Sequence, residues 1–231
     1  MMEATTGKLR ERSCRTLVKG YDDPGPMIRD IIEHKIDAAV RGTMGSLEVL
    51  TELKHQFEIK EVCRTAVLEN GSGKQFLLTP VGIDEGRSLT QRIELVKSTI
   101  EYFAPVGWKL KVGVLSKGRP EDSSRGREIR RSLDDGESMT KRLNEMGIPA
   151  KHYSILLEES VREADLVVAP DGVTGNLIFR SLHFVGGGRA YGAPVVNVPE
   201  VFVDTSRSKV DFSDAILLAA GLAAAQHGVR Q

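Results

Sequence analysis

Cysteine and metal-ligand motifs are scarce in this sequence of 231 residues. It contains two cysteines, Cys14 and Cys63, which are far apart and lack C-x-x-C spacing. This pattern excludes a disulfide framework and favours the reducing cytoplasm as the location of the protein. The five histidines form no H-E-x-x-H motif and no other paired-ligand spacing, so we expect no metal site.

Long apolar runs are also missing. The longest, Ala215–Ala225, has eleven residues, which is too short to cross the about 30 Å hydrocarbon core of a bilayer. The first residues, MMEATTGKLRERSCR, are charged and lack the apolar segment of a signal peptide. We therefore expect a soluble protein without a membrane partner.

Neither sign of charge is in excess. The 32 basic residues balance the 32 acidic ones, so no global charge attracts the chain to nucleic acid or to an anionic membrane. The basic residues between positions 125 and 131 interleave with an acidic one and have no aromatic residue among them. Nucleic-acid binding is therefore not expected.

Several nucleotide-binding and hydrolase motifs are absent. The chain has no P-loop sequence G-x-x-x-x-G-K-[ST] and no G-x-S-x-G elbow. The glycine-rich stretch GGGRAYG, residues 186–192, is not G-x-G-x-x-G, and no predicted strand leads into it. A nucleotide site of the P-loop or Rossmann type is therefore not indicated.

Strand-like and helical segments alternate along most of the chain. This alternation predicts an α/β fold with a mostly parallel sheet flanked by helices. We expect strands at 36–40, 62–68, 76–81, 110–115, 152–157, 165–169 and 194–203. We expect helices at 23–35, 45–56, 87–104, 125–146, 174–184 and 211–228.

In such sheets, ligands bind beyond the carboxyl ends of the strands. The first loop to consider there holds Arg41, Gly42 and Thr43, where an arginine beside exposed backbone N–H groups could hold phosphate or carboxylate. The alternative is an ion pair at a strand end. The loop that begins at Ser116 is a second candidate, and its alternative is a solvated connection into a charged helix.

The sequence APDGVTGN, residues 169–176, offers a third loop at the start of a helix. Its candidate ligand-binding residues are Asp171, Thr174, Gly175 and Asn176. The first turn of a helix has unpaired N–H groups and the positive end of the helix dipole, and Gly175 allows a ligand close to the backbone. The alternative is that Asp171 or Thr174 only caps the helix.

The fourth loop, 204–208, contains Ser206 and Arg207. Arginine can bind a polyanion bidentately, and serine can donate a hydrogen bond to a developing negative charge. The alternative is a turn followed by a helix cap, at Asp211 or Ser213. The following helix is apolar on most faces, so it is either buried or part of a homodimer interface.

In this order, the loops resemble the phosphate acetyl/butyryltransferase family, with PlsX acyltransferases as more distant relatives. DLVVAPDGVTGNLIFRSL is similar to that family's strand, proline–aspartate turn and Gly-Asn helix start. GGGRAYGAPV is similar to its glycine-rich segment, and VDTSRSKVDFSDAI to its Ser-Arg signature. A closer likeness, carried by IDAAVRGTMGS and LLTPVGIDEG, is to methanogen proteins called methanogenesis marker protein 4, or MtxX, whose name places them among methyltransferases.

The resemblance implies a two-lobed architecture like that of isocitrate and isopropylmalate dehydrogenases, with a shortened N-terminal lobe. Residues 1–58 and 195–231 would form the first lobe and residues 59–194 the second. It further implies a protein that binds phosphate or acyl phosphate and transfers an acyl group between phosphate and coenzyme A.

The resemblance also assigns roles to individual residues. Ser206 and Arg207 match the Ser-Arg pair that stabilises charge and binds the anionic substrate. Asp214 matches an aspartate that deprotonates the coenzyme A thiol if one residue is inserted before it, and Asp211 is the competing candidate. Gly175 and Asn176 match the Gly-Asn turn. Two other functions stay open: a methyltransferase or methyltransferase-associated subunit of methanogenesis, and a non-catalytic binding protein.

Overall fold

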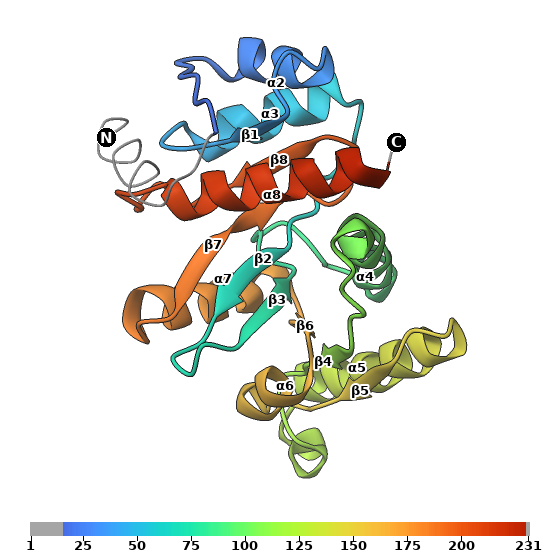
Figure 1. Ribbon diagram of the computed structural model, residues 1–231. Helices are drawn as coiled ribbons and strands as arrows, with labels where there is room; N and C mark the ends of the chain where they lie inside the picture. The colour runs from blue at the N-terminus through green and yellow to red at the C-terminus, as the bar shows by residue number, and fades with distance from the viewer. Residues whose placement is uncertain (1–15, 230–231) are drawn as a thin grey trace. The chain divides into compact units, whose positions relative to one another are not determined.

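The computed structural model describes residues 16–229, which form two compact units (Figure 1). Among these residues, unit 1 comprises 16–62 and 191–229, and unit 2 comprises Cys63–Ala190. Cys14 and the charged N-terminal segment lie outside the described residues. The fold is α/β with a mostly parallel arrangement of strands flanked by helices, which confirms the predicted class.

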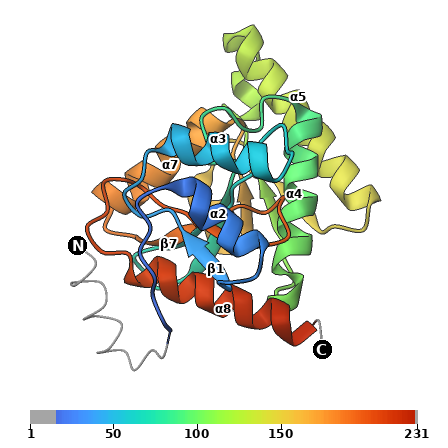
Figure 2. The ribbon, with the colours of Figure 1, turned by 90° about the horizontal axis from the view of Figure 1, so that it is seen from above.

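Unit 1 is a small three-layered structure. Its strand order is β1-β8-β7, in which β1 and β8 are parallel and β8 and β7 antiparallel. Helices α2 and α3 cover one face, with α2 lying over β1 in Figure 2, and α8 covers the other. The strands are β1 (Ala38–Val40), β7 (Arg189–Pro194), which brings the chain from unit 2 into unit 1, and β8 (Val201–Asp204). The helices are α2 (Pro24–Ile32), α3 (Ser46–Gln56) and α8 (Ser213–Val229).

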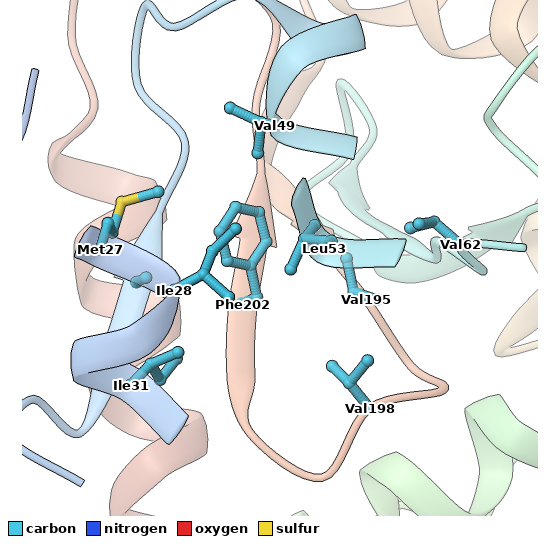
Figure 3. Packing of buried hydrophobic residues seen from close by; sticks show 10 residues of the cluster. Met27, Ile28, Ile31, Val49, Leu53, Val62, Val195, Val198 and Phe202 are labelled. Atoms are coloured by element: carbon cyan, nitrogen blue, oxygen red, sulfur yellow. The ribbon is translucent and has the colours of Figure 1, made fainter. Parts of the chain in front are cut away.

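The core of unit 1 follows from strand alternation. Successive side chains of a strand point to opposite faces, and Phe202 of β8 points toward α2 and α3, where it is fully buried (Figure 3). The two helices place apolar residues at helical spacing against it. The other buried members of this cluster are Met27, Ile28, Ile31, Ala39, Val49, Leu53, Val62, Val195 and Val198.

Unit 2 has the strand order β2-β3-β6-β4-β5. β2 and β3 form an antiparallel hairpin, and the other neighbours are parallel. The strands are β2 (Ala66–Glu69), β3 (Gln75–Thr79), β4 (Val112–Val114), β5 (Ala150–His152) and β6 (Leu166–Val168). The α-helices are α4 (Leu89–Phe103), α5 (Arg127–Glu145), α6 (Leu157–Glu163) and α7 (Gly172–Arg180). Short 3-10 helices occupy Ala104–Val106 and Pro120–Arg125, and the π-helix Ser181–Val185 follows directly on α7.

Two of the predicted strands are wrong in their extent. The segment 194–203 is not one strand, because the chain turns between β7 and β8 and the two strands run antiparallel. Residues 189–192 of the glycine-rich stretch belong to β7 itself, and residues 186–188 lead into it. The strand predicted at 152–157 ends at His152, since Ser154 has a positive φ of 57° and helix α6 begins at Leu157. Its apolar residues Ile155–Leu157 belong to that turn and helix start.

Helix α7 packs very closely on the loop that follows β3. A Cβ atom on Gly175 would lie 1.8 Å from the carbonyl oxygen of Pro80, and one on Gly172 would lie 1.8 Å from that of Gly82. Asn176 Nδ2 donates a hydrogen bond of 2.9 Å to the carbonyl of Val81. A side chain at either position would clash with these carbonyl oxygens. The absence of a Cβ atom at Gly172 and Gly175 therefore allows α7 to lie this close to the loop within unit 2.

Gly175→Ala tests this close contact. The added methyl group has no room beside the Pro80 carbonyl, so we expect a loss of about 2–3 kcal/mol in the free energy of unfolding. Gly221, in α8, has nothing within 4 Å of a Cβ position, and Gly221→Ala should gain about 0.5–1 kcal/mol from helix propensity. Urea unfolding followed by circular dichroism measures both. A wild-type midpoint for Gly175→Ala would refute the packing argument.

Candidate anion-binding site

Arg41 is buried at the carboxyl end of β1 and anchors the end of β8. Its Nε donates to a carboxylate oxygen of Asp204, and its two terminal nitrogens donate to the carbonyls of Met44 (2.7 Å) and Thr205. The Arg41 backbone N–H donates to Val203 at 3.0 Å. These contacts match the alternative interpretation of Arg41, an ion pair at a strand end, and they commit the guanidinium group to the protein itself.

Further hydrogen bonds join the two loops beside this ion pair. The Thr205 amide donates to Asp204 Oδ1 at 2.8 Å, and the Thr205 hydroxyl donates to the Gly42 carbonyl at 3.1 Å. Gly42 has a φ of 65°, in the left-handed region that glycine adopts without steric cost. The structure thus brings Arg41 and Gly42 next to the start of loop 204–208, while the neighbouring Thr43 is exposed.

Ser206 and Arg207 follow directly on this anchored segment. Ser206 is partly buried, and its hydroxyl oxygen accepts a hydrogen bond of 3.3 Å from the Ser208 amide. Its carbonyl accepts one of 3.1 Å from the Lys209 amide. Arg207 is exposed, and within residues 16–229 its side chain has neither a hydrogen bond nor an ion pair. A guanidinium group on a fixed loop is therefore available to an anion.

The two candidate bases lie at the N-terminus of α8. Asp211 Oδ1 accepts a hydrogen bond of 2.9 Å from the Ser213 amide, so Asp211 closes the turn before the helix. Asp214 lies in the first helical turn, where a carboxylate interacts favourably with the helix dipole. Both are partly buried and in unit 1, together with Ser206 and Arg207.

In unit 2, Asp171 caps helix α7. Its Oδ1 accepts a hydrogen bond of 2.8 Å from the Thr174 amide, and its Oδ2 forms an ion pair of 2.8 Å with Lys117, which also pairs with Glu128 at 2.6 Å. Partial burial opposes ionisation of Asp171, but the contacts with Lys117 and Thr174 outweigh it and hold its pKa below the usual range. The aspartate itself therefore occupies the helix N-terminus.

Ser116 is buried at the carboxyl end of β4. Its hydroxyl donates to the Gly118 carbonyl at 3.2 Å and lies 3.0 Å from Nε2 of His152. Burial lowers the pKa of His152, partly offset by the charge of Glu137. Ser116 and Asp171 thus have partners inside unit 2, and Gly175 and Asn176 face the loop after β3 as described above.

The sequence places Asp204 and Lys117 in two of the candidate loops but assigns neither a role. Asp204 is the last residue of β8, and Lys117 lies three residues beyond the end of β4. Because α/β proteins place ligand-binding groups at such strand ends, position alone is the signal that could have identified them. Among the residues that the structure describes, no group of three or more His, Cys, Asp or Glu side chains has an arrangement that could hold a metal ion. No helix within 16–229 is both long and apolar enough to span a membrane.

Known structures share this fold. A branched-chain phosphotransacylase from Enterococcus faecalis superposes with a TM-score of 0.66 at 21% identity, covering 88% of this chain and 78% of that chain. A 4-hydroxythreonine-4-phosphate dehydrogenase from Klebsiella pneumoniae superposes with a TM-score of 0.55 at 11% identity, covering 88% and 67% of the two chains. At these identities the likeness concerns the fold alone.

Sequence comparison identifies nearer relatives. No model of a protein family matches the chain. A protein of Methanosarcina mazei named "Putative methyltransferase mtx subunit X" is 44% identical over 202 residues, which cover 87% of this chain and 72% of the relative. At this identity and coverage, the chain belongs to the mtx subunit X family.

Proposed function

We propose that unit 1 binds the phosphate group of a small anion, inorganic phosphate or an acyl phosphate, at loop 204–207. The observation that carries the proposal is the contrast between Arg41 and Arg207. Arg41 is buried and fully engaged in holding the loop, whereas Arg207, on the same loop, is exposed and unpaired within residues 16–229. A preorganised arginine without an internal partner suits bidentate binding of phosphate.

The reaction we propose is acyl transfer between phosphate and coenzyme A as co-substrate. The thiolate sulfur attacks the acyl carbon and forms a C–S bond, the C–O bond to phosphate breaks, and phosphate leaves with the electron pair. A free thiol has a pKa of about 8.5, so a base that takes its proton accelerates the attack. Asp214 or Asp211 would accept that proton.

Two residues of the loop would serve the transition state of this reaction. Arg207 would bind the phosphoryl oxygens throughout, and the Ser206 hydroxyl would donate a hydrogen bond to the oxyanion that forms at the carbonyl oxygen of the acyl group. The description of the Enterococcus neighbour as a phosphotransacylase supports this reaction class. Ser116, Asp171, Thr174, Gly175 and Asn176 stay predicted as substrate-binding residues of unit 2.

Methyl transfer is the second candidate function, and the name of the Methanosarcina relatives favours it. In that case the protein acts in methanogenesis, as a methyltransferase or as a subunit associated with one. The two functions differ in the donor, because acyl transfer requires acyl phosphate, whereas methyl transfer requires a methyl donor such as S-adenosylmethionine. A cytoplasmic location and a homodimer are further parts of our proposal.

Arg207→Ala tests the phosphate site. Removing one charge-assisted contact should weaken binding of inorganic phosphate and acetyl phosphate by about tenfold or more in isothermal titration calorimetry. The control is Arg29→Ala, which removes the same charge from an exposed position of unit 1 at the end of α2. Equal affinity of the Arg207→Ala and Arg29→Ala proteins would contradict the proposed site.

Ser206→Ala tests the reaction. With acetyl phosphate and coenzyme A as substrates, we expect kcat to fall by about a hundredfold while KM for acetyl phosphate changes little, since the hydroxyl acts on the transition state. The rise in ultraviolet absorbance as the product thioester forms gives the rate. Phosphate binding without any turnover would instead identify a non-catalytic binding protein, and turnover only with S-adenosylmethionine would identify a methyltransferase.

A further inference from the structure

Helix α7 packs on unit 2 through its glycines and leaves its apolar side chains outside the core. Gly172 and Gly175 are the buried residues of α7, and the π-helix Ser181–Val185 that continues it has no buried residue. A helix of a globular protein normally buries its apolar stripe. The segment 173–185, which the structure describes throughout, has seven large apolar side chains, and none of them is buried: Val173, Leu177, Ile178, Phe179, Leu182, Phe184 and Val185.

Five large apolar side chains of this region are exposed and form one surface, which we call the α7 patch. Val173 and Leu177 are neighbours on the helix because residues four apart share a face, and Phe184, seven residues on from Leu177, continues that face. The loop after β3 borders the start of the helix, where the carbonyl of Gly82 faces Gly172. The exposed fractions in the patch are 68% for Ile83, 53% for Val173, 60% for Leu177, 41% for Phe184 and 86% for Val185.

Aromatic rings and an arginine gather at the C-terminal end of the patch. The Phe184 ring lies 4.7 Å from the His183 ring and meets Phe179 edge-on at 6.2 Å, measured between centroids. The Arg180 guanidinium group lies 5.2 Å from the Phe184 ring and has no ion pair within residues 16–229. Aromatic residues and arginine are enriched at protein–protein interfaces. This composition therefore favours a protein as the partner of the α7 patch.

The area of the α7 patch suits a contact between two copies of this chain. Its exposed fractions correspond to about 450 Å² if each fully exposed side chain presents about 150 Å². A standard interface buries about 800 Å² on each partner, of which about 65% is apolar in homodimers, or about 500 Å². The patch therefore supplies most of the apolar surface that one side of a stable homodimer needs.

The charges at the two ends of the patch are complementary to each other. Asp84, beside Ile83, has a side chain that is 46% exposed, and its ion pair with Arg64 is long, at 3.7 Å. Arg180 supplies the opposite charge near the other end. In a two-fold contact, residue i of one copy meets residue j of the other and the reverse. Two α7 helices that pair antiparallel therefore bring the acidic end of each copy to the basic end of its partner.

Helix α8 offers no comparable surface. Within residues 213–228, no isoleucine or leucine of α8 is exposed. The sequence left two alternatives for this apolar helix, burial or a homodimer interface. Its packing on the sheet of unit 1 accounts for its apolar residues without a second copy. The apolar side chains of α7 have no such cover within the described chain.

We propose that the α7 patch is the surface through which two copies of this chain form a homodimer. The copies pair about a two-fold axis, with their α7 helices antiparallel and Leu177 near the centre of the contact. Each copy then covers the apolar side chains that the other leaves exposed. This inference rests on the homodimer proposed above and assigns its interface to unit 2.

Sedimentation velocity of the full-length protein tests this proposal. We expect the wild type to sediment as a dimer at about 10 μM, and Leu177→Glu to raise the dissociation constant of the dimer by about a hundredfold or more, because the contact would bury an unpaired carboxylate. The control Leu47→Glu makes the same substitution at a leucine of α3 in unit 1 that is 83% exposed. This control should remain a dimer.

Three results would overturn the proposal. These are a monomeric wild type at about 100 μM, a Leu177→Glu protein that dimerises as tightly as the wild type, or equal dissociation of the Leu177→Glu and Leu47→Glu proteins. Circular dichroism establishes that each variant is folded. The Leu177→Glu protein should bind inorganic phosphate like the wild type, and Arg207→Ala should remain a dimer, so failure of the phosphate site and failure of this interface can be told apart.

Discussion

The buried ion pair between Arg41 and Asp204 is the interaction on which the candidate site depends. It joins the ends of β1 and β8, and the same guanidinium group holds the carbonyls of Met44 and Thr205. Burying two charges costs several kcal/mol of desolvation, which a close pair offsets only when further hydrogen bonds satisfy both groups. Here the Thr205 amide also donates to Asp204. Loop 204–208 is therefore fixed before any ligand arrives, and this rigidity is what Ser206 and Arg207 require to act on an anion.

Much of the fold could be predicted from the sequence, because hydrophobic periodicity reports which face of each element is buried. The alternation of strands and helices predicted the α/β class, and α3, α4 and α5 lie within two residues of their expected bounds. The strand prediction was wrong where the chain reverses direction within an apolar segment. Residues 194–203 are apolar throughout most of their length, yet they contain the connection between β7 and β8. Periodicity cannot separate one long strand from two strands joined by an apolar loop.

The individual roles of the loop residues were harder to predict, since they depend on contacts between distant segments. Arg41 pairs with a residue 163 positions away, and its engagement cannot be read from the local sequence. Gly175 allows a close approach, as expected, but the group that approaches is the Pro80 carbonyl of the same unit. Asn176 likewise donates to Val81. The local sequence indicated that Gly175 and Asn176 make close contacts. Only the fold shows that their partners are the carbonyl groups of Pro80 and Val81.

The most direct test of the proposed phosphate site is an NMR titration of the ¹⁵N-labelled protein with inorganic phosphate. Phosphate bound there contacts the loop that the Arg41–Asp204 pair anchors. We predict that the amide resonances of Ser206 and Arg207 shift with one shared dissociation constant, with Arg41 and Asp204 retaining their mutual contact. Unchanged Ser206 and Arg207 resonances at saturating phosphate would contradict the proposed site, whether or not phosphate binds elsewhere on the chain.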